Sequence, residues 1–290
     1  MLNGKAKGII AIVTSAFGFS LMALFVRLCD DCGGPVSAFQ KGFFRNIVAL
    51  AIAAVVFWRS RGRVAPVPTP TCPLRVWALL LLRSVLGTAG IFAHFYALSH
   101  ITIAEGLTLN KTAPFFTVLF AWGVLGERVN RRQVLALALA FLGVVLIAKP
   151  GFAGTSAFPL VIGLLSGICA GGAYACVRAL RRHSVSPAFI VLFFSAFSCL
   201  ASVPFMAAGL DPMTGRQVLV LLGAGAGAAI GQFGITLAYG YAAPRDIAVF
   251  DYSGILFAAA FGFLFFVQVP DLLSAAGFFA IISAAIFLLR

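Results

Sequence analysis

Charged residues that could bind a solute stand inside the long apolar segments of this chain. Arg45, Arg83 and Lys111 are deep cations, and Asp251 is the deepest acid. If these segments lie in lipid, each ion costs about 2.5 to 3.5 kcal/mol there and needs a partner or water. Three cations opposed by one acid predict a positively charged cavity, which would bind a solute bearing a carboxylate or a phosphate. A buried carboxylate can also exchange protons, so Asp251 is the candidate coupling residue.

Other polar side chains near these ions could line the same cavity. Asn110 adjoins Lys111, and His94, Tyr96 and Tyr252 offer hydrogen bonds and aromatic walls. We therefore expect substrate contacts from Arg45, Arg83, His94, Tyr96, Asn110, Lys111 and Tyr252. Three alternatives stay open: Asp251 forms only a structural ion pair with Lys111 or Arg83, Arg45 binds helix-end carbonyls, and His94 is a packing residue.

The composition predicts that the apolar segments lie in a membrane. The chain has 290 residues, of which 62% are hydrophobic and 10% charged, and its mean hydropathy is +1.07. A soluble domain carries about a quarter charged residues, so this chain could not cover its apolar surface with polar groups. The net charge of +13 sits mainly in short loops between apolar segments. That placement is typical of membrane orientation signals and argues against nucleic acid as a partner.

Apolar segments long enough to cross a bilayer follow one another along the whole chain. We predict an all-α integral membrane protein with ten transmembrane helices, at Gly8–Leu28, Ala38–Trp58, Val76–Leu98, Ile103–Leu125, Val134–Ala148, Leu160–Ala179, Ala188–Ala208, Val218–Tyr241, Ile247–Gln268 and Leu272–Leu289. The first is read as a retained helix because no small-residue cleavage site follows it. The longest loop is the Arg- and Pro-rich stretch Arg59–Arg75.

The distribution of Lys and Arg predicts the orientation. If the N-terminus is cytoplasmic, nearly all cations outside the spans fall on the cytoplasmic side, and only Lys149 and Arg216 fall on the other. This places both termini inside and requires an even number of crossings. Short loops on a single chain suggest a bacterial inner membrane.

Internal symmetry predicts two inverted repeats, residues 1–150 and 151–290, within one membrane domain. A shift of 151 residues aligns Arg27 with Arg178, and after the long loop a shift of 141 aligns Asn110 with Asp251. Because each half holds five spans, two equivalent halves must face opposite sides of the membrane. Inverted repeats with a midplane site between them are an architecture of secondary transporters. We therefore expect a small organic solute to be moved by alternating access about a central cavity.

The sequence also resembles the drug/metabolite transporter superfamily, specifically its EamA-type ten-helix carriers. The resemblance rests on a small-residue stretch in the first span, an early arginine in the second, and a run ending in a Gly-Glu-Arg exit: Ser15–Ser20, Phe44–Asn46, Tyr96–Leu98, Ala104–Glu105, Thr112–Pro114 and Leu125–Arg128. It covers the first half well and the second in layout, where Gly126-Glu127 becomes Val267-Gln268. It implies two inverted five-helix repeats around a central cavity.

Glycine and proline positions indicate where helices pack or bend. Gly223, Gly227 and Gly231 are four residues apart, which predicts a small-residue stripe for close helix contact or gating. Pro114 lacks a backbone N–H and is predicted to kink the fourth span as a gate element.

Other functional classes find less support in the sequence. No metal-ligand spacing and no nucleophile beside a base is present, so neither a metal, a cofactor nor an enzyme activity is predicted. An oligomeric channel is the main alternative to a carrier, with an intramembrane enzyme less favoured, and no filter-like loop is visible. Cys29 and Cys32 flank two aspartates in a polar loop and leave a disulfide open. The expected partners are a small solute, lipid and possible coupling protons, whereas the sequence leaves the oligomeric state undetermined.

Overall fold

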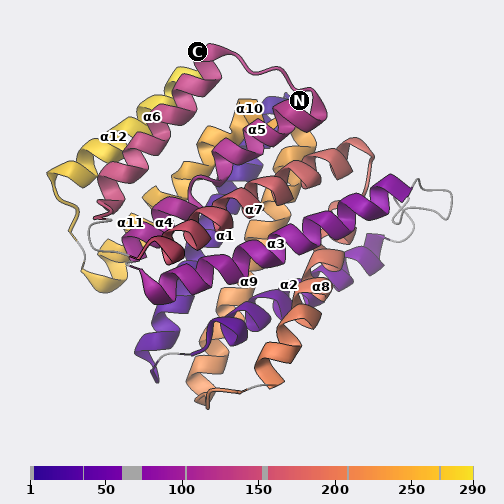
Figure 1. Ribbon diagram of the computed structural model, residues 1–290, viewed down its shortest axis with the longest axis vertical. Coiled ribbons are helices and arrows are strands. Elements are labelled where there is room, and N and C mark those ends of the chain that lie inside the picture. Colours follow the sequence, from indigo (N-terminus) through magenta and orange to yellow (C-terminus); the bar gives the residue numbers. More distant parts are fainter. Residues whose placement is uncertain are drawn as a thin grey trace.

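The computed structural model describes residues 3–34, 36–60, 74–101, 103–151, 156–207, 209–267 and 269–289. Most of the predicted Arg- and Pro-rich loop lies outside these residues, as do the predicted span ends Ala208 and Gln268. Within the described ranges the chain forms helices and no strand. The elements are α1 (Gly4–Asp31), α2 (Ala38–Ser60), α3 (Leu74–His100), α4 (Ile103–Asn110), α5 (Ala113–Leu125), α6 (Arg131–Ala148), α7 (Ala157–Arg182), α8 (Pro187–Ala207), α9 (Gly215–Tyr241), α10 (Pro244–Ile247), the 3-10 helix η1 (Ala248–Tyr252), α11 (Ser253–Phe266) and α12 (Leu272–Leu289) (Figure 1).

Nine helices of the described chain are long and apolar enough to cross a membrane. They include Pro244–Phe266, which combines α10, η1 and α11. The predicted span Ile103–Leu125 is instead divided into α4, of 8 residues, and α5, of 13 residues. Each of these pieces alone is shorter than the roughly 20 residues that one crossing requires.

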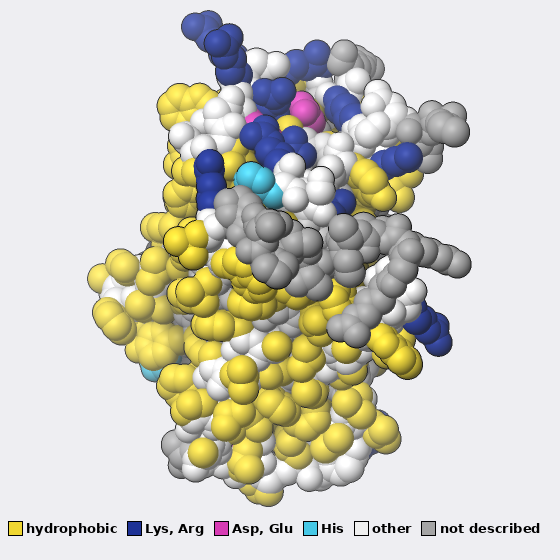
Figure 2. Space-filling model, turned by 90° about the vertical axis from the view of Figure 1, so that its right-hand side faces the viewer, with side chains coloured by type: hydrophobic (Ala, Val, Ile, Leu, Met, Phe, Trp, Pro, Cys, Tyr) yellow, Lys and Arg dark blue, Asp and Glu magenta, His cyan; other side chains and the backbone are white. Residues whose placement is uncertain are grey.

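The outer surface is apolar, as lipid contact requires. Leu74, Leu200 and Leu219 are exposed over 84%, 72% and 70% of their surfaces. Figure 2 shows a broad hydrophobic surface with Lys and Arg side chains gathered toward one end. That end also carries both termini (Figure 1), and there Lys5 Nζ donates to the carbonyl of Leu288 at 3.4 Å. We call it the terminus side, and the other end the opposite side. This surface identifies an integral membrane protein.

Helices approach one another closely where both partners carry small residues. α1 packs along α9, and α3 packs along α7. A Cβ atom built on Gly227 would lie 2.8 Å from the backbone nitrogen of Met22 and 2.9 Å from the carbonyl oxygen of Gly18. Gly223 and Gly231 face the rings of Phe25 and Phe19. The predicted glycine stripe thus lies in the α1–α9 contact, where only glycine leaves enough room for the neighbouring helix.

The last helices of the two halves have equal lengths and pack against each other. α6 and α12 each contain 18 residues, and Asn130 and Asp271 accept backbone hydrogen bonds at their starts. Arg132 near the start of α6 donates to the carbonyl of Phe287 near the end of α12. Farther along, in the second half of α6 and the first half of α12, Cβ atoms on Gly143 and Gly277 would each lie 2.6 Å from the other's carbonyl oxygen. These two helices are therefore antiparallel.

The second helices of the halves, α2 and α8, are also antiparallel. Phe57 at the end of α2 packs on Phe189 at the start of α8, with ring centroids 5.7 Å apart. Nearer the middle, Asn46 donates to Ser198 Oγ at 3.0 Å. At the far end, the side chain of Gln40 donates to the carbonyl of Asp211.

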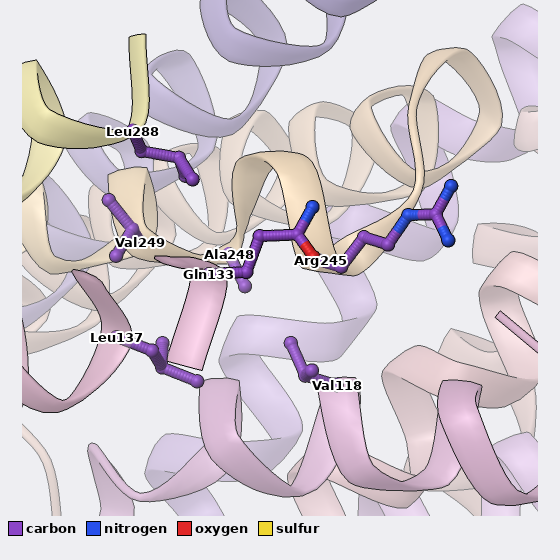
Figure 3. A pocket seen from close by; sticks show the side chains of 7 residues that line it. All are labelled: Val118, Gln133, Leu137, Arg245, Ala248, Val249 and Leu288. Atoms are coloured by element: carbon purple, nitrogen blue, oxygen red, sulfur yellow. The ribbon is translucent and has the colours of Figure 1, made fainter. Parts of the chain in front are cut away.

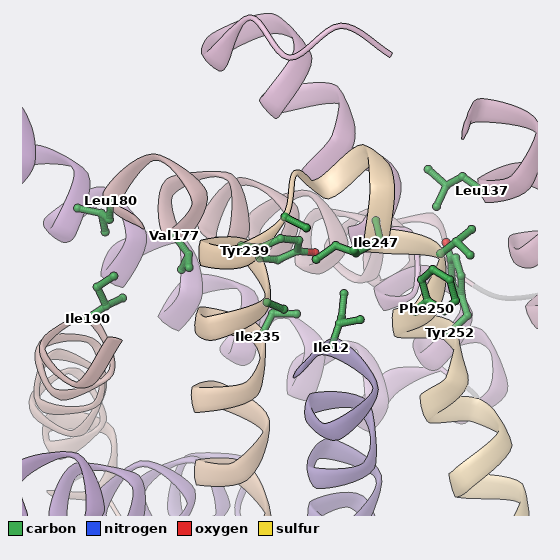
Figure 4. Close-up of a cluster of buried hydrophobic side chains, with 14 of the residues drawn as sticks. Ile12, Leu137, Val177, Leu180, Ile190, Ile235, Tyr239, Ile247, Phe250 and Tyr252 are labelled. Carbon is green, nitrogen blue, oxygen red and sulfur yellow. The ribbon is translucent and has the colours of Figure 1, made fainter. Parts of the chain in front are cut away.

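Buried apolar side chains gather on the terminus side. Figure 4 labels ten members of this cluster, which come from both halves: Ile12, Leu137, Val177, Leu180, Ile190, Ile235, Tyr239, Ile247, Phe250 and Tyr252. A second buried cluster, on the opposite side, consists of Cys29, Val36 and Leu221. The larger cluster therefore closes the space between helices at the end that carries the termini.

Candidate substrate-binding site

Two interrupted helices face each other inside the molecule, and an ion pair joins their interruptions. The first interruption is Lys111-Thr112 between α4 and α5, and the second is η1 between α10 and α11. Lys111 Nζ lies 3.3 Å from Asp251 Oδ2, and the hydroxyl of Tyr252 donates to the carbonyl oxygen of Lys111 at 3.1 Å. Of the two ion pairs that the sequence left open for Asp251, the structure contains the one with Lys111. Interrupted helices place charged groups and free backbone atoms at the middle of a membrane protein.

Local sequence explains why the first helix stops. The hydroxyl of Thr112 donates to the carbonyl of Leu109 at 2.6 Å, which offers the backbone an alternative to helix continuation. Pro114 then occupies the first turn of α5, where its missing N–H removes no helical bond. In place of the predicted kink at Pro114, the structure has a two-residue break at Lys111-Thr112, which precedes the proline. The carbonyl freed at Lys111 is the one that Tyr252 satisfies.

Arg83 is held rigidly inside the bundle. Its side chain is 1% exposed, and its guanidinium carbon lies 3.9 Å from the centroid of the Phe194 ring. Arg83 Nη2 donates to Gln232 Oε1 at 3.0 Å. A Cβ atom on Gly87 would lie only 2.2 Å from Arg83 Nη1, so the absence of a side chain at Gly87 leaves the room that the guanidinium occupies. Arg83 Nε has no hydrogen-bond partner among the residues that the structure describes.

Arg45 and His94 have similar unsatisfied atoms. The guanidinium of Arg45 lies 5.8 Å from the centroid of the Phe19 ring. Its buried Nε and the buried Nδ1 of His94 find no hydrogen-bond partner in the described part of the chain. Tyr174, on α7, lies within electrostatic range of Arg45, Arg83 and Asp251 and therefore stands among the deep ions. The two guanidinium Nε atoms offer unused donors to a solute, and Nδ1 of His94 offers a donor or an acceptor according to the tautomer of the ring.

The remaining predicted site residues are distributed differently. Asn110 donates to Ser166 Oγ at 3.2 Å, so it joins the start of the interruption to α7. Tyr96 is 39% exposed and stacks on His100, with ring centroids 4.1 Å apart. Its ring also meets Phe158 edge-on at the outer surface. The structure therefore brings Lys111, Asp251 and Tyr252 together and leaves Tyr96 on the exposed face of α3.

A second charged cluster, on the terminus side, was not among the predicted site residues. Glu127 Oε1 accepts from Arg178 Nε at 2.8 Å and from Arg182 Nη2 at 2.5 Å, and the glutamate side chain is 3% exposed. Arg178 also donates to the carbonyl of Tyr239 on α9, and Arg182 to that of Leu125 on α5. We name Glu127, Arg178 and Arg182 the terminus-side latch. Glu127 belongs to the Gly-Glu-Arg motif in the sequence. Nothing in the sequence distinguishes Arg178 and Arg182 from the other cations near the membrane surface.

A small pocket lies on the terminus side. Its cavity volume is only about 10 Å³, and it is lined by residues of α5, α6, α10, η1 and α12: Val118, Gln133, Leu137, Arg245, Ala248, Val249 and Leu288 (Figure 3). Gln133 also donates to Asp246 Oδ1 at 2.9 Å. Sites for organic ligands usually enclose about 300 to 1,000 Å³, so this pocket is too small for such a solute.

Cysteine and metal chemistry contribute little to this site. Cys29 and Cys32 are both free thiols, and Cys29 is buried in the last turn of α1. Across the described ranges, no group of three or more His, Cys, Asp or Glu side chains could hold a metal ion.

The membrane-spanning helices and the ion pair between two interrupted helices define the chain as a membrane protein of transporter type. Residues 6–149 match the EamA-like transporter family. The chain is 32% identical over 293 residues to the pseudopaline exporter CntI of Pseudomonas aeruginosa, covering 100% of this chain and 98% of that protein. It is 30% identical over 213 residues to a riboflavin transporter of Rhizobium johnstonii, covering 72% and 69% of the two chains.

The chain therefore belongs to the EamA-like transporter family. A solved crystal structure superposes with a TM-score of 0.78 over 97% of this chain and 96% of that one, at 18% identity, which shows a shared fold. The protein is thus an integral membrane transporter of small molecules and not an enzyme.

Proposed function

We propose that this protein is a secondary carrier that moves a small anionic or zwitterionic organic solute by alternating access. The observation that carries the proposal is the Lys111–Asp251 ion pair at the facing interruptions, with the unsatisfied guanidinium atoms of Arg45 and Arg83 nearby. In a low-dielectric interior such groups require counter-ions, and a solute carboxylate or phosphate is suited to that role. His94, Asn110 and Tyr252 would complete the site.

The proposed architecture is ten spans in two inverted repeats, residues 1–150 and 151–290. α4 and α5 together would form the fourth span, as α10, η1 and α11 form the ninth. The antiparallel pairs α6–α12 and α2–α8 support the inversion, because corresponding helices of inverted repeats run in opposite directions. Further support comes from the left-handed residues Gly126 and Val267, which end α5 and α11 at corresponding positions.

The asymmetry between the two sides supports alternating access. On the terminus side, α5 packs against α10 and η1. The corresponding helices on the opposite side, α11 and α4, make no comparable contact among the described residues. The terminus-side latch and the large buried cluster lie at the same closed end. We infer a conformation that is closed at the terminus side, from which the carrier would reach the reverse state by opening the latch.

Direction and location follow from charge and from relatives. The cations of the terminus side would face the cytoplasm of a bacterial inner membrane, with both termini inside. The relative with 32% identity over the whole chain is named an exporter, which favours export and makes pseudopaline one solute to test. Asp251 would couple this movement to protons. Its carboxylate contacts Lys111, and it could bind a proton once a solute anion takes its place beside Lys111.

Counterflow in proteoliposomes tests the carrier. Vesicles loaded with one solute should accumulate labelled solute from outside in a saturable manner, with preference for anionic or zwitterionic compounds. A preference for quaternary ammonium compounds would contradict the site assignment. Single-channel current without counterflow would instead identify the protein as a pore.

A further inference from the structure

Arg45 and Arg83 differ from the other cations that lie near acids in this protein. Lys41 pairs with Asp30 at 2.7 Å, and Lys111 pairs with Asp251 at 3.3 Å. Lys149, Arg178, Arg182 and Arg245 also have acid partners. Within the described residues, no ion pair joins an acid to Arg45 or Arg83. Arg83 is buried and Arg45 is half-buried, and a charge that is removed from water without a counter-charge is costly. A ligand could supply the counter-charge that these two guanidiniums lack.

The guanidinium of Arg83 is preorganised to receive such a ligand. The ring of Phe194 supports one face, Gln232 fixes Nη2, and Gly87 leaves the space that the group occupies. The Nε atom remains free within the part of the chain that the structure describes. A fixed planar guanidinium binds carboxylate or phosphate with little loss of side-chain entropy.

The balance of charge indicates how many negative charges the ligand carries. Lys111 and Asp251 neutralise each other, whereas Arg45 and Arg83 together contribute two positive charges close enough to influence one another. An ammonium group on the ligand would compete with Lys111 for Asp251 and would leave the guanidinium charges only partly compensated. A single negative charge would likewise leave one guanidinium without a counter-charge.

We propose that the carrier's preferred solute is a dianion, with two carboxylates or one phosphate monoester bound between Arg45 and Arg83. This inference rests on the proposed carrier function and narrows its substrate class. Arg45 and Arg83 are then specificity-determining residues that distinguish doubly from singly charged solutes of the same shape. The Lys111–Asp251 pair contacts the remainder of the solute and serves the coupling step.

Matched solute series provide the test. Purified protein in lipid nanodiscs is titrated, at constant ionic strength, with dicarboxylates of three to six carbons and with their monoamides. Phosphate monoesters are compared with their parent alcohols, which separates the two sources of a double charge. Ligand-induced thermal stabilisation and calorimetric affinity are the readouts. At least one dianion is expected to bind about tenfold or more tightly than its singly charged or neutral partner, as expected for one added buried charge contact.

Two variants and two matched controls separate binding from folding. Arg83→Met and Arg45→Met are compared with Arg75→Met on α3 and Arg59→Met on α2, which replace exposed arginines of the same helices. Each deep substitution should reduce dianion affinity at least about tenfold and abolish the preference over the monoamide. It should also raise the thermal stability of the ligand-free protein, because an uncompensated buried charge has been removed. A purely structural arginine would lower that stability.

The outcomes distinguish this inference from the carrier function. Monoanions or zwitterions that bind as well as every dianion would overturn the inference, and so would a panel in which no dianion binds. Saturable counterflow of a zwitterion in that case would leave the carrier intact. Dianion binding that depends on Arg45 and Arg83, but without counterflow of any bound solute, would support the site and refute the carrier.

Discussion

Replacing Glu127 with glutamine should open the terminus side. Glu127 Oε1 holds Arg178 and Arg182 at 2.8 and 2.5 Å, and its side chain is 3% exposed. Removing one partner of a buried ion pair costs about 3 to 5 kcal/mol. Arg182 is 42% exposed, so solvent screening reduces its share to about 1 kcal/mol or less. Arg178, at 16% exposure, dominates, and about 3 kcal/mol is a reasonable total.

This energy changes the balance of states only if the latch forms in one of them. At about 1.4 kcal/mol for each factor of ten, Glu127→Gln would then shift the equilibrium about 100-fold toward the state open at the terminus side. The amide keeps the shape of the side chain and loses the charge. The variant should therefore fold, and its conformational equilibrium is the property expected to change.

Cys176 provides a native reporter of this opening. The thiol lies on α7, is 7% exposed and is within electrostatic range of Arg83. Alkylation of Cys176 in nanodiscs, measured by mass spectrometry, should be at least about tenfold faster in Glu127→Gln than in the parent protein. Asp271→Asn, which removes an exposed pair with Lys149 at the opposite side, serves as the matched control. An unchanged Cys176 rate in folded Glu127→Gln would refute the latch.

Two further predictions concern proton coupling and helix packing. Asp251→Asn should abolish the pH dependence of counterflow, whereas Asp271→Asn should preserve it. Hydrogen bonding from Lys149 lowers the pKa of Asp271 from 3.8 to about 2. The ionised carboxylate therefore stabilises the folded protein fully above about pH 3.8, and this stabilisation is lost as the pH falls through about 2. Gly227→Ala should destabilise the α1–α9 contact by about 1 to 3 kcal/mol, since its methyl group would meet backbone atoms of α1. Gly123→Ala has open space and should be neutral or slightly stabilising, as thermal unfolding in detergent can measure.

Composition and periodicity were sufficient to predict the membrane class and most helices. Lipid imposes a simple rule, because a spanning backbone must satisfy its own hydrogen bonds and long apolar segments therefore become helices. The spacing by four of Gly223, Gly227 and Gly231 predicts a packing or gating surface, because residues four apart lie on one helix face. The structure identifies its partner as α1. The predicted correspondence between Asn110 and Asp251 lies at the region where Lys111 and Asp251 meet.

The helix interruption, the burial of individual side chains and the latch depend on tertiary structure, because each requires contacts between segments that are distant in sequence. The span expected at Ile103–Leu125 is interrupted because Thr112 and Pro114 disfavour a continuous helix, and Tyr252 of the other half satisfies the freed carbonyl. Only packing distinguishes Tyr96, on the outer face of α3, from Arg83 on the buried face of the same helix. The latch likewise depends on the ends of α5 and α7, which are far apart in sequence.

The sequence by itself determined that this chain lies in a membrane and that its helices carry a few costly ions, and it predicted that the two halves are related. Those properties follow from solvent exclusion and from local spacing, which act along the chain. Only the tertiary structure decided which ions neutralise each other and which two guanidiniums remain without an acid among the described residues. The physical reason is that charge compensation depends on distances of a few ångströms between side chains from different helices, and the order of residues does not specify those distances.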